Sequence, residues 1–221
     1  MASEHIYKQY DSDLEAIRAK VLEMGTLVEE QTSNAIQSLL DTDVKLAEKV
    51  IKKDEQINDL EVLIDEEASL LIAKRSPAAG DLRNIMMMLK IITDLERMGD
   101  EAAKIARSTT RIFEDNRMSK SKFNEIKGMA KAVQEMIKTA LNSFARLDLT
   151  DTIDILEKDK QVDDDYRSTM RELLTFMLED PRTISMSLES MFIAKSLERI
   201  GDHAVNISQS VIYTVKGKDV R

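Results

Sequence analysis

Apolar residues recur at helical spacing along almost all of the 221 residues of the chain, and strand-like alternation is absent. The clearest stretch runs from Phe123 to Leu147, where apolar residues follow one another at alternating intervals of three and four. This spacing places them on one face of a long helix, as in a coiled-coil-like bundle. The residues of this seam are Phe123, Ile126, Ala130, Val133, Ile137, Ala140, Phe144 and Leu147.

The periodic stretches are separated by residues that favour the ends of helices. These breaks carry Asp, Ser, Thr or Pro, and they lie at 41–43, 76–77, 119–121, 148–151 and 180–183. The pattern therefore predicts an all-α protein with six long helices. We expect them at about 4–40, 43–74, 78–113, 120–147, 151–179 and 183–215.

The six predicted helices form two copies of three. A shift of 105 residues lays Met24 on Met129 and Val28 on Val133. Beyond the turn the shift becomes 102, and DLERMGDEA (94–102) lies over SLERIGDHA (196–204). A repeat of this length predicts two tandem, pseudo-symmetric three-helix bundles, which we assign to residues 1–115 and 116–221.

Composition supports long helices and excludes several functions. Gly and Pro make 8 of 221 residues, about 4% against a usual share of about 12%, which argues against a turn-rich β fold. The absence of Cys excludes zinc-thiolate sites, disulfides and thiol catalysis. A net charge of -9 disfavours nucleic acid as a partner. No apolar run approaches the ~18 residues of a membrane span, and the N-terminus lacks a secretory signal, so we expect a cytoplasmic protein.

Enzymatic motifs are also missing from the sequence. It has no glycine-rich phosphate loop, no nucleophile elbow and no HExxH motif, and it contains only two His. An enzyme built on this chain would have to work with carboxylates.

Paired carboxylates mark the third predicted helix of each copy. Glu96 and Asp100 lie beside the apolar stripe of one copy, and Glu198 and Asp202 lie beside that of the other. Residues four apart on a helix have Cβ atoms about 5–6 Å apart, so each pair directs two carboxylates at one place. The two stripes are Ile91, Leu95, Met98, Ala102 and Ile105, and Ile193, Leu197, Ile200, Ala204 and Ile207.

The second helix of each copy brings further oxygen ligands to the same level. Counted from the intervening turns, Asp54 and Asn58 stand within about 5 Å in height of the first pair, at ~1.5 Å per residue. Asp159 and Asp163 match the second pair in the same way. Each antiparallel hairpin can therefore gather four oxygen-bearing side chains.

Carboxylate and amide oxygens suit a hard cation such as magnesium, manganese, calcium or iron. The alternative is a solvated charged surface without metal, in which Glu96 and Glu198 pair with Arg97, Arg199 or a facing Lys. Gly in the middle of a helix costs about 1 kcal/mol relative to Ala, so Gly99 and Gly201 also need a reason. Close helix packing or the shell of a bound ion would supply one.

Several motifs give the chain a resemblance to a known family. They are the doubled LERxGD, AKRSPAAGDLR (73–83), LEDPRTI (178–184) and the final VKGKDVR. From about Tyr7 onward the sequence resembles the PhoU family of phosphate-transport regulators. The resemblance implies a cytoplasmic, non-enzymatic repressor of the phosphate-starvation response that forms two three-helix bundles and dimerises. It implies two partners, a PhoR-like sensor histidine kinase and the PstB-like ATPase of the phosphate importer.

The resemblance also implies metal binding through E(D)xxxD motifs. Carried over, the motif gives Glu96 and Asp100, Glu198 and Asp202, and Asp159 and Asp163. The first copy departs from it on the second helix. Asn58 stands where the motif has Asp163, and the ExxxD of Glu55 and Asp59 is displaced by one residue, a rotation of about 100°. Either Asp54 with Asn58 or Glu55 with Asp59 can face the site, but not both.

Three functions fit these observations. The first is a non-enzymatic regulator in which a cation, magnesium, manganese or iron, fixes the hairpin that partners contact. The second is a carboxylate-bridged metalloenzyme akin to the ferritin-like di-iron proteins, although those use Glu-x-x-His ligands that neither copy supplies. The third is a metal-free helical scaffold.

Overall fold

The computed structural model describes residues 2–114, 124–150 and 152–217. Within these ranges the chain forms six long helices and one 3-10 turn, with no strand. The elements are α1 (Ala2–Asp41), α2 (Val44–Arg75), α3 (Ala79–Glu114), α4 (Asn124–Arg146), α5 (Thr152–Glu179), η2 (Pro181–Thr183) and α6 (Ile184–Lys216). The predicted all-α class is confirmed. Three predicted boundaries lie outside the described residues. They are the start of the fourth helix at 120, the start of the fifth at 151 and the division between the repeats at 115/116.

The turns use the residues that the sequence indicates. The Asp43 carboxylate accepts a hydrogen bond from the backbone amide of Leu46 at 3.0 Å and so caps α2. Ser76, in the left-handed region with φ 46°, ends the same helix by donating its amide to Ile72 O at 3.0 Å. The Asp180 carboxylate accepts hydrogen bonds from the backbone amide of Arg182 at 3.1 Å and from its guanidinium at 2.9 Å. These bonds close the turn between α5 and α6. Local capping therefore fixes where these hairpins reverse.

The apolar stripes form the core. All ten residues of the two stripes on α3 and α6 are at most 1% exposed, and the α4 seam is buried from Ile126 to Phe144. Leu147 does not belong to this seam. It lies beyond the end of α4 with φ 50°, and it is 36% exposed because the chain has already left the helix. Phe123 lies outside the described residues.

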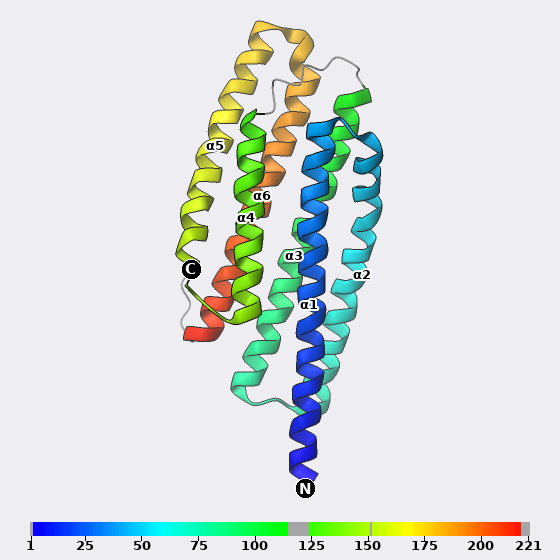
Figure 1. The fold of residues 1–221 in the computed structure, drawn as a ribbon, viewed down its shortest axis with the longest axis vertical. Coiled ribbons are helices and arrows are strands. Elements are labelled where there is room, and N and C mark those ends of the chain that lie inside the picture. Colours follow the sequence, from blue (N-terminus) through cyan, green and yellow to red (C-terminus); the bar gives the residue numbers. More distant parts are fainter. Residues whose placement is uncertain (1, 115–123, 151, 218–221) are drawn as a thin grey trace.

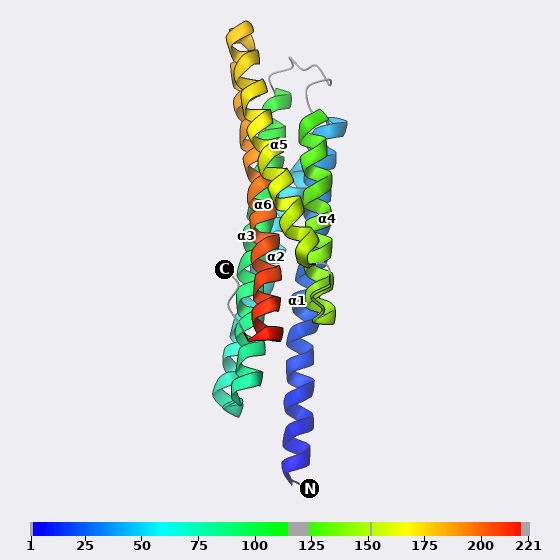
Figure 2. The same cartoon turned by 90° about the vertical axis from the view of Figure 1, so that its left-hand side faces the viewer.

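The two sets of three helices lie side by side and inverted. Figure 1 shows the α2–α3 turn at the end where the N-terminus lies, whereas the α5–α6 turn is at the opposite end. The view in Figure 2 shows the same elongated bundle from the side. α3 packs along α6, and α1 contacts α4. The repeats are thus related by a pseudo-two-fold axis across the long axis of the molecule.

Hydrogen bonds across the α3–α6 interface follow this symmetry. His203 Nδ1 lies 2.9 Å from Asp94 Oδ1, and Ser196 hydrogen-bonds Glu101. Under the shift of 102, residue 94 corresponds to 196 and residue 101 to 203, so the two contacts are symmetry equivalents. Arg199 adds a salt bridge to Glu101 at 3.1 Å. Arg199 therefore reaches the other repeat and not its neighbour Glu198.

The two mid-helix glycines face different surroundings. A Cβ on Gly99 would lie 3.0 Å from Ile57 Cδ1 and 3.3 Å from Gln31 Oε1. A Cβ on Gly201 would lie 3.5 Å from Met136 Cε, an ordinary contact. Close packing of α3 on α2 and α1 therefore explains Gly99, whereas space remains at Gly201.

Alanine substitutions should separate these two cases. We expect Gly201→Ala to raise the free energy of unfolding by up to about 1 kcal/mol, since Ala favours a helix and the methyl group fits. Gly99→Ala should lower it by about 1–2 kcal/mol, because overpacking outweighs the gain in helix propensity. Urea unfolding followed by circular dichroism measures both. Equal effects of the two substitutions would show that packing does not distinguish them.

Candidate functional site

The first cluster of carboxylates lies between α2 and α3. Asp54 on α2 is only 7% exposed, although it is a charged residue. Its Oδ1 accepts a hydrogen bond from Gln31 Nε2 on α1 at 3.3 Å, and its Oδ2 lies 3.9 Å from Arg107 Nη2 on α3. Polar groups from all three helices of the first repeat therefore meet at this point.

The predicted carboxylates of α2 and α3 lie close enough for their negative charges to raise one another's pKa values. Burial raises the pKa of Asp54 most, and the negative charge of Asp100 raises it further, against the effects of Gln31 and Arg107. Burial also raises the pKa of Glu96, with contributions from Asp100, Glu61 and Asp54. The level-matching of α2 with α3 thus brings Asp54, Glu96 and Asp100 into one electrostatic cluster.

The other candidates on α2 lie at the surface. Asn58 is exposed, and so are both members of the displaced motif, Glu55 and Asp59. Glu61, one turn further along α2, is the half-buried acid whose charge reaches Glu96. The structure places Asp54 in the cluster and leaves open which second residue of α2 would join it.

Sequence reasoning missed two members of the first cluster. Gln31 is a polar residue in the apolar seam of α1, and this was the available signal. Arg107 lies seven residues after Asp100 and therefore two turns along the same face of α3. Gln31 donates a hydrogen bond to Asp54, and Arg107 places a positive charge beside it.

The second cluster lies between α5 and α6. Burial raises the pKa of Asp159 to about 6, and the charges of Asp202, Asp163 and Glu198 add to the shift. The pKa of Asp202 is raised as well, by burial and then by Glu198. The charges of the other three residues predicted for the second repeat therefore all act on Asp159.

Two cations lie beside this second cluster. Lys195 Nζ is 2.7 and 2.5 Å from the two oxygens of Glu198, and Arg167 Nη2 is 3.7 Å from Asp163 Oδ2. Within the described residues, Asp159 itself accepts no hydrogen bond and pairs with no cation. It is the least compensated carboxylate of the four.

The repeat explains this difference between the clusters. Gln31 and Arg107, which support Asp54, correspond to Met136 and Gln209 in the second repeat. The thioether of Met136 cannot donate a hydrogen bond, and Gln209 carries no charge. Asp159 therefore keeps an oxygen-rich surrounding without the donor and the guanidinium that its counterpart has.

These donor sets fit a hard cation to different degrees. In the second repeat, four carboxylates of like charge lie close together, and their mutual repulsion favours a positive ion. In the first repeat Arg107 lies beside the buried Asp54 itself, and Arg97 pairs with Glu96 at 3.3 Å. The cations of the second repeat pair with Glu198 and Asp163 and leave Asp159 without one. Among residues that the structure describes, no three Asp, Glu or His side chains stand in the geometry of a formed metal site. Ligation would therefore need the carboxylate side chains to rotate toward one another.

Comparison with known proteins identifies the family. A family model described as the PhoU domain matches residues 21–109 and 126–211, one segment in each repeat. The chain belongs to the PhoU family. The resemblance drawn from LERxGD and the other motifs is confirmed.

PhoU-family relatives match nearly the whole chain. A phosphate-specific transport system accessory protein PhoU homolog from Pseudomonas aeruginosa is 45% identical, and the match covers 98% of this chain and 89% of the relative. The accessory protein PhoU from Escherichia coli K12 is 40% identical, covering 99% and 90% respectively. Both relatives are named as accessory proteins of phosphate-specific transport.

Two crystal structures of PhoU proteins share the fold. PhoU from Pseudomonas aeruginosa superposes with a TM-score of 0.91 at 44% identity, over 95% of this chain and 100% of that one. A phosphate transport system regulatory protein PhoU from Streptococcus pneumoniae gives 0.87 at 29% identity, over 96% and 99%. In the described part of this PhoU-family chain, no helix is long and apolar enough to cross a membrane.

Proposed function

We propose that this PhoU-family protein is a non-catalytic negative regulator of the phosphate-starvation response. It couples a phosphate ABC importer to a sensor histidine kinase and restrains uptake when phosphate is plentiful. It acts in the cytoplasm, where it contacts a PstB-like ATPase and a PhoR-like kinase. The observation that carries this proposal is the match, over nearly the full chain, to accessory proteins of phosphate-specific transport.

Deletion of the gene tests the regulatory role. Phosphate-scavenging genes should switch on in phosphate-rich medium, and a plasmid copy of the wild-type gene should silence them again. A transcriptional reporter for such a gene measures the change. Continued silence after deletion would contradict the proposal.

We also propose that the carboxylate clusters bind a divalent or iron-type cation, more tightly in the second repeat than in the first. The support is the donor set of Asp159, Asp163, Glu198 and Asp202, together with the uncompensated charge on Asp159. A bound cation would neutralise these carboxylates and hold α5 against α6. The hairpin that partners contact would then keep one shape.

Calorimetric titration with Mn²⁺ and Mg²⁺ tests the cation. Changing Glu198 and Asp202 to Ala should abolish the tighter binding event, and changing Glu96 and Asp100 to Ala should abolish the weaker one. Glu48→Gln with Glu66→Gln, which changes two exposed acids of α2 outside both clusters, is the matched surface control and should bind like wild type. If wild type shows no saturable binding, the protein is a metal-free scaffold and its acids are solvated charge.

A homodimer is the third part of the proposal. The α5–α6 hairpin carries exposed apolar side chains spaced four residues apart on each helix, at Leu174 and Leu178 and at Ile184, Leu188 and Phe192. These offer an apolar face to a second copy. Light scattering should give twice the chain mass for wild type and a smaller mass for Leu178→Glu with Phe192→Glu. A monomeric wild type would contradict this part alone.

A further inference from the structure

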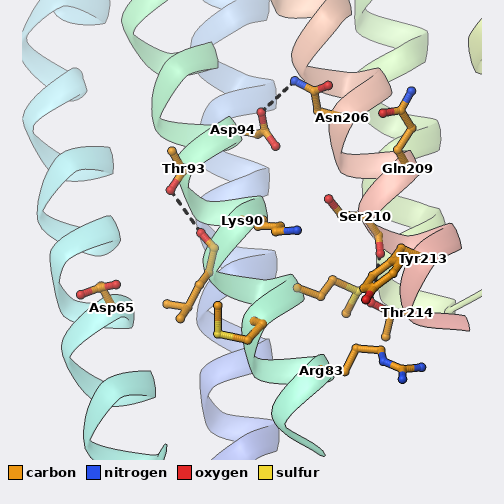
Figure 3. Close-up of a pocket in the computed structure, with 13 residues that line it drawn as sticks. Asp65, Arg83, Lys90, Thr93, Asp94, Asn206, Gln209, Ser210, Tyr213 and Thr214 are labelled. Carbon is orange, nitrogen blue, oxygen red and sulfur yellow. Dashed lines mark hydrogen bonds between the residues drawn. The ribbon is translucent and has the colours of Figure 1, made fainter. Parts of the chain in front are cut away.

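A pocket opens between the two repeats, away from both carboxylate clusters. It has a volume of about 620 Å³ and lies between the first half of α3 and the last half of α6. Figure 3 shows Arg83 and Lys90 on α3 and Tyr213 on α6, with the two cationic side chains directed toward α6. Pockets of about 300–1,000 Å³ hold small organic ligands. The size therefore suits a molecule larger than a bare ion.

The cations of this pocket are positioned but not neutralised. Arg83 Cζ and Lys90 Nζ each lie 5.8 Å from the centre of the Tyr213 ring. A cation–π contact holds a charged group in place without cancelling its charge. Within the described residues, neither Arg83 nor Lys90 forms a salt bridge with a carboxylate. Two free positive charges on a chain of net charge -9 are thus held at one pocket.

The other end of the α3–α6 interface shows what normally satisfies such a cation. There Arg111 on α3 pairs with Glu189 on α6 at 3.5 Å. Under the shift of 102, Arg111 corresponds to Tyr213 and Glu189 corresponds to Met87. The pocket end therefore has Tyr213 and Met87 where its counterpart has an ion pair, so that salt bridge has no equivalent beside Arg83 and Lys90.

Two acids line the pocket: Asp94, which already has hydrogen-bond partners, and Asp65, which lies on α2. Asp94 accepts a hydrogen bond from Asn206 at 3.2 Å and contacts His203. Asp65 belongs to α2 and lies apart from the α6 side of the pocket in Figure 3. Ser210 and Gln209 add side chains that, among the described residues, have no hydrogen-bond partner. The free groups are mostly donors, which suits an acceptor-rich anion.

We propose that this pocket binds the phosphate group of a small phosphorylated organic molecule. Arg83 and Lys90 bind the phosphate oxygens, the Ser210 hydroxyl and the Gln209 amide supply further donors, and the remaining volume holds the organic part. The ligand contacts α3 of one repeat and α6 of the other, so its binding favours one arrangement of the two repeats.

Calorimetry on the full chain in chelated buffer tests the pocket, because chelation removes any metal-mediated contact. The probes are inorganic phosphate, ADP and fructose 1,6-bisphosphate, with adenosine as the uncharged control. We expect saturable binding of at least one organic phosphate, no binding of adenosine, and at least about tenfold weaker binding after Arg83→Gln with Lys90→Met. Binding should also weaken with salt.

Matched variants make the result decisive. Arg171→Gln with Lys138→Met removes the same two charges from exposed positions outside the pocket and should bind like wild type. Tyr213→Phe should bind like wild type as well, whereas Tyr213→Ala should weaken binding because the cations lose their platform. Equal losses in both double variants, or no binding of any phosphate probe, would overturn the proposal. Inorganic phosphate binding as tightly as the organic probes would overturn the organic part and identify free phosphate as the ligand.

Discussion

Replacing Phe144 by alanine is expected to lower the free energy of unfolding by about 3–5 kcal/mol. Phe144 is fully buried on α4, and its ring lies 5.9 Å from the guanidinium of Arg18 on α1. Arg18 also donates to the carbonyl of Ala145 at 2.7 Å, near the end of α4. Loss of the ring leaves a cavity where the first helices of the two repeats meet. The midpoint of thermal unfolding should fall by about 6–20 °C.

Leu147→Ala is the matched control for this change. It also removes a large apolar side chain near the end of α4, but Leu147 is 36% exposed. We expect a change within about 0.5 kcal/mol. Denaturant unfolding of both variants gives the comparison. A loss of less than 1 kcal/mol in Phe144→Ala, or equal losses at both positions, would show that Phe144 does not anchor α4 to α1.

Asp159→Asn should make the metal-free protein more stable at pH 7, by about 1–2 kcal/mol after allowance for solvent screening. The pKa of Asp159 is about 6 in the folded protein, against an ordinary value of 3.8. The folded state therefore holds this proton more tightly than the unfolded chain does. The resulting stability is fully present below pH 3.8 and is lost as the pH rises through 6. Asn cannot ionise, so the variant escapes this loss.

The difference between variant and wild type carries the test. It should be largest at pH 7 and shrink toward zero near pH 4, as measured by urea unfolding with a chelator present. Glu157→Gln, an exposed change on the same helix, should differ from wild type by less than about 0.5 kcal/mol. A variant that is less stable than wild type at pH 7 would contradict the repulsion among Asp159, Asp202 and their neighbours. Saturating Mn²⁺ should reverse the order, since only the wild type keeps the full ligand set.

Local rules were sufficient to predict the helices. Periodicity fixes which face of α3 or α6 is buried, and capping by Asp43, Ser76 and Asp180 fixes where the helices end. The fixed rise per residue also brought Asp54 level with Glu96, and Asp159 level with Asp202. Each of these predictions depends on one helix or on one hairpin.

What the sequence could not show depends on contacts between distant helices. An internal repeat does not indicate whether its two copies pack in parallel or inverted. Sequence spacing therefore suggests Glu198 as the partner of Arg199, whereas the structure pairs Arg199 with Glu101 of the other repeat. Gln31 joins Asp54 across 23 positions of sequence and from a different helix. Helical spacing carries no information about such approaches.

Because α3 and α6 pack in inverted orientation, the interface between the two repeats resembles the isologous interface of a two-fold dimer of identical subunits. In such a dimer every contact occurs twice, and a sequence change must satisfy both places at once. Fusion into one polypeptide removes that restriction. Asp94–His203 and Glu101–Ser196 show the two ends already divergent in chemistry while equivalent in position. One end thus holds the Arg111–Glu189 ion pair, whereas the other has Tyr213 and Met87 at the equivalent positions and forms the proposed binding pocket.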